Sequence, residues 1–215
     1  MLEELLNIFF PERCIGCEKQ GSILCALCER TITTKPRALS SWCGTLYDYR
    51  NPLVKKAIWS LKYHRKKSLG KYFGIALYRE FFKHLTHERK AFDQPIILIP
   101  IPASAKALAM RGYNHSNVIA QTIGACAERD AFPLHVRDDI LHKKRENIRQ
   151  VEAGGKKERE VNIKAVFEVR NGEDLRGKTI VLIDDVTTTG ATISEARKKL
   201  KEWGPKRVLA LAVAH

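Results

Sequence analysis

Two adjacent carboxylates follow a hydrophobic run near the end of the sequence, in the segment VLIDDVTTTGAT (181–192). Carboxylates at the carboxyl end of a parallel strand lie at the crevice where open α/β sheets bind ligands. Asp184 and Asp185 are therefore candidates to accept hydrogen bonds from the vicinal hydroxyls of a ribose, or to reach Mg²⁺ through water. We take this pair as the candidate catalytic centre.

The loop after the two acids has the composition of a phosphate site. Its threonines offer hydroxyl donors, and Gly190 lets the backbone turn tightly and come close to a ligand. Amides at the start of the next helix can then surround a phosphate, helped by the helix dipole. The residues assigned to this loop are Val186, Thr187, Thr188, Thr189, Gly190, Ala191 and Thr192.

Other phosphate motifs are missing from the sequence. Neither the Walker pattern G-x-x-x-x-G-K-S/T nor the dinucleotide fingerprint G-x-G-x-x-G occurs. A plain strand–turn–helix connection with a capping threonine is the remaining alternative for 181–192. Under that alternative, two acids at the end of a buried strand would carry a desolvation cost without a purpose. The pattern favours a phosphate site.

A second anion pocket is predicted after the apolar, proline-bounded run PIILIPIP (95–102). Small residues, two cations and the start of a helix follow this run, and such a combination can bind an anion. The two cations are Lys106 and Arg111. Taken alone, Arg111 to Asn114 fits a surface turn before a helix equally well.

Four cysteines form two close pairs, Cys14-x2-Cys17 and Cys25-x2-Cys28. Two such pairs can present four thiolates to one tetrahedral ion, and the closed site they form would fold the segment rather than catalyse. The sequence therefore predicts structural Zn²⁺, with a disulfide or an iron–sulfur cluster as the alternatives. Cys43 and Cys126 stand outside the pattern and are expected to be structural.

A basic stretch contains no acid between Asp48 and Glu80. Aromatic residues are interleaved with its cations, a composition that suits single-stranded nucleic acid. The alternative, which we favour on sequence alone, is that the aromatics pack in the core while the lysines face water. The candidate contacts for nucleic acid are Lys62, Arg65 and Lys66.

Composition sets the wider bounds. The chain has 215 residues and a formal net charge of +14, which favours anionic partners without naming one. Glu3 and Glu4 stand where a secretory signal would be positive, and no apolar run approaches the length of a membrane span. We expect a cytoplasmic protein without a membrane span, whose cysteines are thiols or metal ligands.

Alternating elements must position these residues. A helical pattern over 2–10 precedes the cysteines, and a polar linker is expected around 33–41. Strand, helix and strand in close succession imply a parallel sheet. Strands are predicted over 42–49, 95–102, 165–169, 178–185 and 207–213. Helices are predicted over 53–62, 69–85, 114–129 (capped by Asn114) and 191–203, and a polar excursion over 142–164.

The segment VLIDDVTTTGAT resembles the 5-phosphoribosyl-1-pyrophosphate motif of type I phosphoribosyltransferases. The resemblance implies that Asp184 and Asp185 bind the ribose hydroxyls and that 187–192 hold the 5-phosphate. P-x-P followed by Arg-Gly-Tyr-Asn (111–114) is similar to the signature of the ComF family, in which Gln usually stands where this chain has His115. In that fold, Lys106 and Arg111 become candidate ligands of the pyrophosphate.

The ComF resemblance extends over nearly the whole chain. It implies an α/β fold with a central, mostly parallel sheet, an N-terminal zinc-finger module over 1–40 and a phosphoribosyltransferase-like domain over 41–215. It also implies a hood over 143–164 that includes Arg145 and Gln150. The expected ligands are 5-phosphoribosyl-1-pyrophosphate and Mg²⁺, with a role in handling imported single-stranded DNA beside a competence helicase. The alternatives are a competence scaffold without transferase activity and a nucleotide-salvage transferase.

Overall fold

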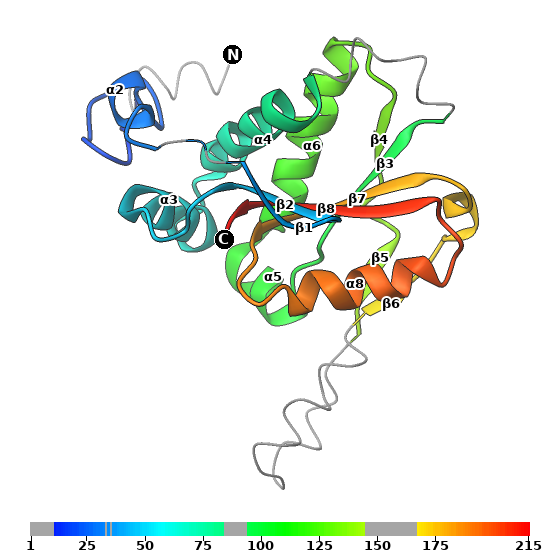
Figure 1. Cartoon of the computed structure of the whole chain (residues 1–215). Coiled ribbons are helices and arrows are strands. Elements are labelled where there is room, and N and C mark those ends of the chain that lie inside the picture. The colour runs from blue at the N-terminus through cyan, green and yellow to red at the C-terminus, as the bar shows by residue number, and fades with distance from the viewer. Residues whose placement is uncertain (1–10, 33, 35, 84–93, 145–166) are drawn as a thin grey trace, which may run out of the picture.

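The computed structural model describes residues 11–32, 34, 36–83, 94–144 and 167–215. Its centre is a six-stranded sheet with the order β1-β2-β8-β7-β3-β4 (Figure 1). Every neighbouring pair in this sheet is parallel except β1 and β2. The strands are β1 (Arg37–Ser40), β2 (Cys43–Tyr47), β8 (Arg207–Ala214), β7 (Thr179–Val186), β3 (Ile96–Pro100) and β4 (Leu134–Val136). The parallel α/β class expected from the sequence is confirmed.

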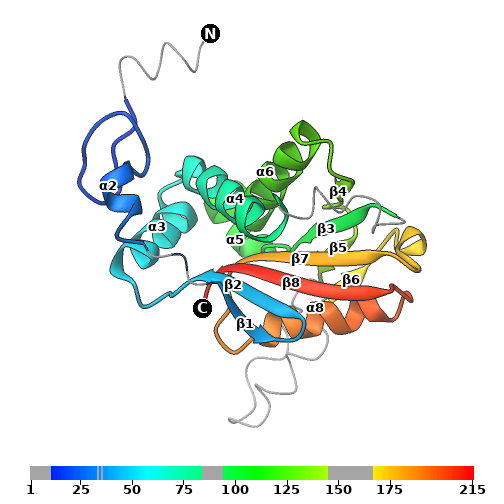
Figure 2. The same cartoon turned by 45° about the horizontal axis from the view of Figure 1, so that its top comes forward.

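Helices cover both faces of the sheet. One face carries α3 (Pro52–Tyr63), α4 (Lys67–Phe81) and α6 (His115–Arg129), and the other carries α8 (Ala191–Lys201), as Figures 1 and 2 show. The remaining elements are α2 (Ala26–Glu29), α5 (Ala105–Arg111), the short 3-10 helix η4 (Glu173–Leu175) and the antiparallel pair β5 (Leu141–Lys143) and β6 (Phe167–Val169).

Strand β7 shows why this sheet must be covered on both faces. Val181 and Ile183 belong to the hydrophobic cluster under α3, α4 and α6, whereas Ile180 and Leu182 belong to the cluster under α8. Successive side chains of a strand point to opposite faces, so a strand that is apolar throughout needs two covering layers. The continuous hydrophobic run in the sequence has this physical meaning.

The linker expected around 33–41 was wrong for Arg37–Ser40, which forms the edge strand β1 and pairs antiparallel with β2. The sheet therefore begins before residue 41, and the division into modules over 1–40 and 41–215 stays a prediction. The helix expected over 2–10 lies outside the described residues. In the part of the chain that the structure describes, no helix has the length and apolar content needed to cross a bilayer.

Helices α4 and α6 pack closely because glycines face the contact. A methyl group on Gly74 would lie 2.6 Å from Thr122 Cβ and 2.9 Å from the carbonyl oxygen of Ile119. Gly70 meets Val118 in the same way, at 2.7 Å. This close packing fixes α6, and the first residues of α6 reach the carboxyl end of β7.

Candidate functional site

The two aspartates end the buried part of β7, and both are turned into the protein. Asp184 is 8% exposed and Asp185 is 3% exposed. Asp184 Oδ1 accepts hydrogen bonds from the Ser116 hydroxyl at 3.1 Å and from the Asp185 amide at 2.9 Å. Asp185 Oδ1 accepts from the Val186 amide at 2.8 Å. One oxygen of each carboxylate is thus committed to contacts that hold the pair in place.

The second oxygen of Asp185 faces two basic side chains. Lys62 Nζ, from the end of α3, lies 2.7 Å from Asp185 Oδ2, and His115 Nε2, from the first turn of α6, lies 3.5 Å from the same atom. Among the described residues, Asp185 Oδ2 accepts no hydrogen bond of good geometry. The contact with Lys62 is therefore an ion pair, and Oδ2 keeps an unused capacity to accept.

Arg111, expected as a pyrophosphate ligand, belongs to the same cluster. Its guanidinium lies 3.4 Å from His115 Nδ1, 3.5 Å from the Tyr63 hydroxyl and 5.0 Å from the centre of the Tyr63 ring. An arginine can only donate, so His115 Nδ1 accepts and its Nε2–H is left to face Asp185. Arg111 Nε is buried and has no hydrogen-bond partner in the described part of the chain. Lys106, by contrast, is exposed on the first turn of α5.

The surroundings of the two carboxylates shift their pKa values in opposite directions. Burial raises the pKa of Asp184, and the charge of Asp185 raises it further. Burial also acts on Asp185, but His115 and then Lys62 outweigh it and lower the pKa of that carboxyl. Asp185 therefore carries the firm negative charge of the pair, as expected for the member beside the Lys62 ammonium and the His115 N–H donor.

Residues Arg111–Asn114 place the first turn of α6 next to the two aspartates. Gly112 adopts φ +77°, a left-handed conformation that ends α5. The Asn114 side chain accepts from the Ser116 amide at 3.2 Å and donates to the Ile101 carbonyl at 3.0 Å, so it caps α6 and ties it to the end of β3. The Tyr113 hydroxyl donates to the Leu61 carbonyl of α3. Sequence reasoning placed the helix cap correctly and missed that His115 and Ser116 then contact the acids.

The predicted phosphate loop is open, unlike the acid pair. Thr188, Thr189, Ala191 and Thr192 are exposed. Gly190 has φ +75° and starts α8, while the Thr187 amide donates to the Ala214 carbonyl at 3.1 Å and so anchors the loop to the end of β8. The hydroxyls and the first turn of α8 are therefore accessible to a ligand.

The donor set at the acids fits Mg²⁺. Asp184, Asp185 and His115 each offer a ligand atom, and these atoms lie within 4.8 Å of one another. Mg²⁺ commonly binds through one or two carboxylates and completes its shell with water and substrate phosphates. The two aspartates can supply that anchor once Lys62 leaves Asp185.

The four paired cysteines converge, as their spacing predicted. Their sulfur atoms all lie within 4.8 Å of one another, and the two of Cys17 and Cys25 are 3.6 Å apart. Zn–S bonds of about 2.3 Å in a tetrahedron place sulfurs roughly 3.8 Å apart. The Cys25 amide donates to Cys14 Sγ at 3.3 Å. Burial raises the pKa of Cys14, but backbone hydrogen bonds from Cys17 and Cys25 outweigh it and lower that pKa to about 6. The cluster fits a closed zinc site.

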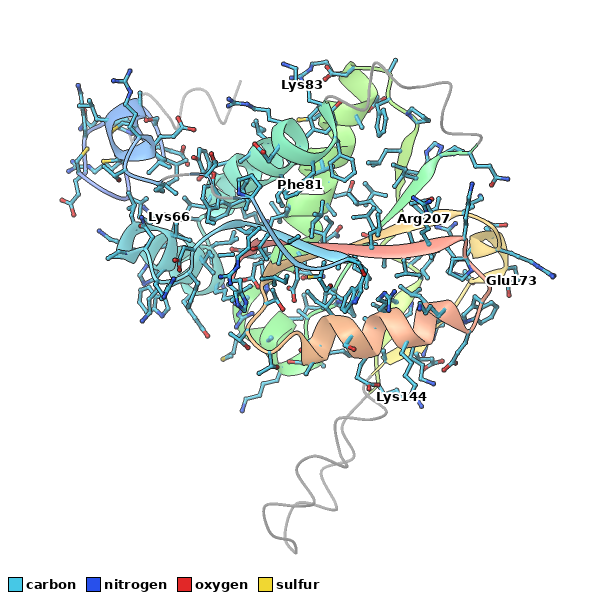
Figure 3. All side chains as sticks on the ribbon, in the orientation of Figure 1. Lys66, Phe81, Lys83, Lys144, Glu173 and Arg207 are labelled. Atoms are coloured by element: carbon cyan, nitrogen blue, oxygen red, sulfur yellow. The ribbon has the colours of Figure 1, made fainter. Side chains whose placement is uncertain are left out.

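The basic stretch divides between core and surface. Phe73 is fully buried, whereas Trp59 and Tyr63 are about half exposed, at 51% and 52%. The prediction that the aromatics pack in the core therefore holds for Phe73 and is wrong for the two on α3. Lys62 was expected as a nucleic-acid contact, but its ammonium is held by Asp185. Arg65 is exposed, and Lys66 lies in the turn between α3 and α4. Figure 3 shows Lys66 at the opposite end of the molecule from Glu173 and Arg207.

The hood residues Arg145 and Gln150 lie outside the described residues. The strands at the two ends of that excursion, β5 and β6, pair antiparallel with Leu141 opposite Val169 and Lys143 opposite Phe167. Leu141 and Phe167 join the hydrophobic cluster beside α8. The start and the return of the excursion are thus fixed next to each other.

Comparison with known proteins identifies the class. Residues 86–215 match the model of the phosphoribosyl transferase domain, which is more than half of the chain. The chain therefore belongs to the phosphoribosyl transferase domain family. A solved hypoxanthine phosphoribosyltransferase from Trypanosoma cruzi aligns over 66% of this chain and 67% of its own, with 10% identity and a TM-score of 0.43.

Individual relatives narrow the classification further. "Competence protein ComFC" of Streptococcus pneumoniae is 28% identical over 89% of this chain and 80% of its own length. "Competence protein F" of Haemophilus influenzae is 23% identical over 96% of this chain and 98% of its own. The Bacillus subtilis protein named ComFC is 28% identical, and the match spans only 41% of its length. These relatives confirm the resemblance to the ComF family.

Proposed function

We propose that this protein binds 5-phosphoribosyl-1-pyrophosphate with Mg²⁺ at the carboxyl end of β7. In this proposal Asp184 and Asp185 accept hydrogen bonds from the ribose hydroxyls, the loop 186–192 holds the 5-phosphate, and Arg111 meets the pyrophosphate. Lys106 is a second pyrophosphate cation that would have to reach in from the exposed side of α5. The hood, with Arg145 and Gln150, would close over the ligand.

One observation carries the proposal. Arg111 Nε, a buried donor in the cluster at the end of β7, has no hydrogen-bond partner within the described residues, and Asp185 Oδ2 in the same cluster is met only by the Lys62 ammonium and, at 3.5 Å, by His115 Nε2. Buried polar groups are nearly always paired, so this arrangement suggests a ligand that accepts from Arg111 and that donates to Asp185 once Lys62 has moved away. A sugar hydroxyl and a phosphate oxygen are such partners.

The same geometry suggests what a transfer reaction would require. In phosphoribosyl transfer the bond from C1 of the ribose to pyrophosphate breaks, the pyrophosphate keeps the electron pair, and an acceptor forms a new bond to C1. Bound Mg²⁺ would neutralise charge on the departing pyrophosphate. Arg111 would stabilise that charge from the protein side, and the aspartates would hold the ribose while C1 becomes cationic.

Calorimetry tests the binding proposal. The native protein should bind 5-phosphoribosyl-1-pyrophosphate in the presence of Mg²⁺, and the double variant Asp184→Asn/Asp185→Asn should not. Asp174→Asn is the matched control, because it makes the same chemical change at a side chain that is 72% exposed. Undiminished binding by the double variant, or none by the native protein, would remove this site from consideration.

Single-stranded DNA is the second candidate ligand, and the exposed rings of Trp59 and Tyr63 favour it. They lie on the exposed stripe of α3 that also carries Lys55 and Lys56. The centres of the Trp59 and Tyr63 rings are 5.7 Å apart. Cations beside exposed aromatics suit backbone charge and base stacking. Together with the competence relatives, this supports a proposed cytoplasmic role in handling imported DNA, beside a competence helicase.

A gel shift with single-stranded DNA at rising salt tests the second candidate. Charge reversal at Arg65 and Lys66 should weaken binding and reduce its salt dependence. Reversal at Lys198 and Lys201 on α8 is the control, because these residues are also basic but lie on the other face of the sheet. An equal loss from both pairs would mean that only net charge matters.

The cysteine cluster completes the proposal with a structural zinc ion. Cys14, Cys17, Cys25 and Cys28 would hold it, and the short helix α2 and its flanking turns would depend on it. The segment has few buried apolar residues, chiefly Ile15, Leu24 and Ile32, and these belong to the same hydrophobic cluster as residues of α3 and α4. Modules of this size usually need a metal to stay folded.

A further inference from the structure

Lys62 is the only lysine within ion-pairing distance of the acid pair among the described residues. It is the last residue but one of helix α3, its side chain is 23% exposed, and its ammonium lies 2.7 Å from Asp185 Oδ2. The sequence distance between the two residues is large, so only the packing of α3 against the end of β7 brings them together. The sequence marked Lys62 only as a candidate contact for nucleic acid and gave no sign that it meets Asp185.

The ion pair covers the atom that a ligand would need. Asp185 Oδ1 is used by the Val186 amide, which leaves Oδ2 as the oxygen available to a hydroxyl or a cation. Lys62 Nζ lies 2.7 Å from Oδ2, where a hydrogen-bonding group or cation of a ligand would have to lie, and Oδ2 is buried beneath it. A second group cannot approach this oxygen closely while the ammonium stays.

The Lys62–Asp185 ion pair has an electrostatic cause. A buried carboxylate without a partner is costly, and Lys62 offsets that cost when no ligand is bound. His115 cannot do so alone, because its Nε2 lies farther away, at 3.5 Å. A ligand that brings Mg²⁺ or hydroxyl donors would take over the same role, so the lysine and the ligand compete for one oxygen.

We propose that Lys62 is a tethered counter-ion that occupies the place of the ligand at Asp185 and is displaced into solvent when 5-phosphoribosyl-1-pyrophosphate binds with Mg²⁺. The inference rests on the proposed function and adds a determinant of affinity to it. Because the ion pair stabilises only the free protein, it weakens ligand binding by the same factor by which the ligand weakens the ion pair.

The variant Lys62→Met tests this proposal, because it keeps most of the aliphatic stem and removes the charge. Calorimetry should show affinity for the sugar pyrophosphate with Mg²⁺ raised by about 10-fold. The midpoint of urea unfolding of the free variant should fall, because a buried charge has lost its partner. A lysine with a merely structural role would lower both quantities. Lys71→Met, a change at an exposed lysine of α4, should alter neither quantity.

A second measurement uses the native protein and does not depend on the variant's folding. Limited modification with an amine reagent, read by peptide mass spectrometry, should label Lys62 slowly without ligand and several-fold faster with it. Lys55 provides the internal reference. Unchanged labelling of Lys62 in the complex overturns the displacement.

The outcomes separate the inference from the function on which it rests. Binding by the native protein that Lys62→Met does not strengthen overturns the inference alone. Binding by neither protein overturns both the inference and the proposed function. Tighter binding by Lys62→Met than by the native protein supports both.

Discussion

Gly16 lies directly against the sulfur of Cys28. A methyl group on Gly16 would stand 2.6 Å from Cys28 Sγ and 3.1 Å from Cys28 Cβ. The absence of a side chain at this residue is what allows the second cysteine pair to close onto the first. The relationship is a packing requirement, since Gly16 does not have a positive φ.

Gly16→Ala should therefore weaken zinc binding by about 10-fold or more, as changes beside metal ligands commonly do. The measurement is competition for Zn²⁺ with a chromophoric chelator. Leu27→Ala, a change at a side chain 70% exposed on α2, should leave the affinity near that of the native protein. Equal affinity of the Gly16 variant would show that the close approach of Gly16 to Cys28 is not required for the cysteines to bind zinc.

Removal of zinc should unfold the N-terminal segment and spare the sheet. A structural zinc site contributes its binding free energy directly to folding, so a chelator should release the amides of Cys14 and Ile15, which donate to Lys19 and Ile23. Hydrogen exchange read by mass spectrometry should show lost protection over 14–32 and unchanged protection in β7 and β8. Protection of 14–32 that survives a strong chelator would contradict a zinc-dependent fold.

Gly74→Ala should destabilise the protein by about 1–3 kcal/mol, the usual cost of overpacking a well-packed contact. The added methyl group would meet the Ile119 carbonyl oxygen at 2.9 Å, and α6 would have to move away from α4. Urea unfolding is the measurement, and Lys71→Ala on the exposed side of α4 is the control. A variant as stable as the native protein would mean that the two helices are less tightly packed than described.

Trp59→Ala should weaken binding of single-stranded DNA by about 1–3 kcal/mol, the range for one lost stacking contact. The centre of its ring lies 4.4 Å from the centre of the His64 ring. About half of the Trp59 surface is exposed, so a base can stack on it. Gel shifts at fixed salt provide the measurement. Ile75→Ala removes an exposed apolar side chain from α4 and should have no effect. An equal loss from both changes would argue against a specific platform.

The long elements of the fold could be predicted because their sequence patterns are strong. The apolar runs of β3 and β7 need two covering layers, and Asn114 caps α6 as expected. The edge strands β1 and β4 were missed because each is three or four residues long and has no clear alternation. Their hydrogen bonds come from a neighbouring strand, which a local pattern does not reveal.

The candidate site divides in the same way. Asp184, Asp185 and the four cysteines could be found because each set is contiguous or regularly spaced in the sequence. The roles of Lys62 and His115 could not, since both meet Asp185 only through the packing of α3 and α6 onto β7. For His115 a weak signal existed, because the residue after a helix cap at this edge of the sheet points toward the strand ends.

The central claim is that the acids and the loop after β7 receive a sugar phosphate. A crystal structure of the native protein with 5-phosphoribosyl-1-pyrophosphate and Mg²⁺ tests it most directly. The account predicts ribose hydroxyls within hydrogen-bond distance of Asp184 and Asp185, the 5-phosphate on the amides of 188–192, and Lys62 withdrawn from Asp185. A ligand bound elsewhere, with Lys62 still on Asp185 and the loop empty, would contradict it.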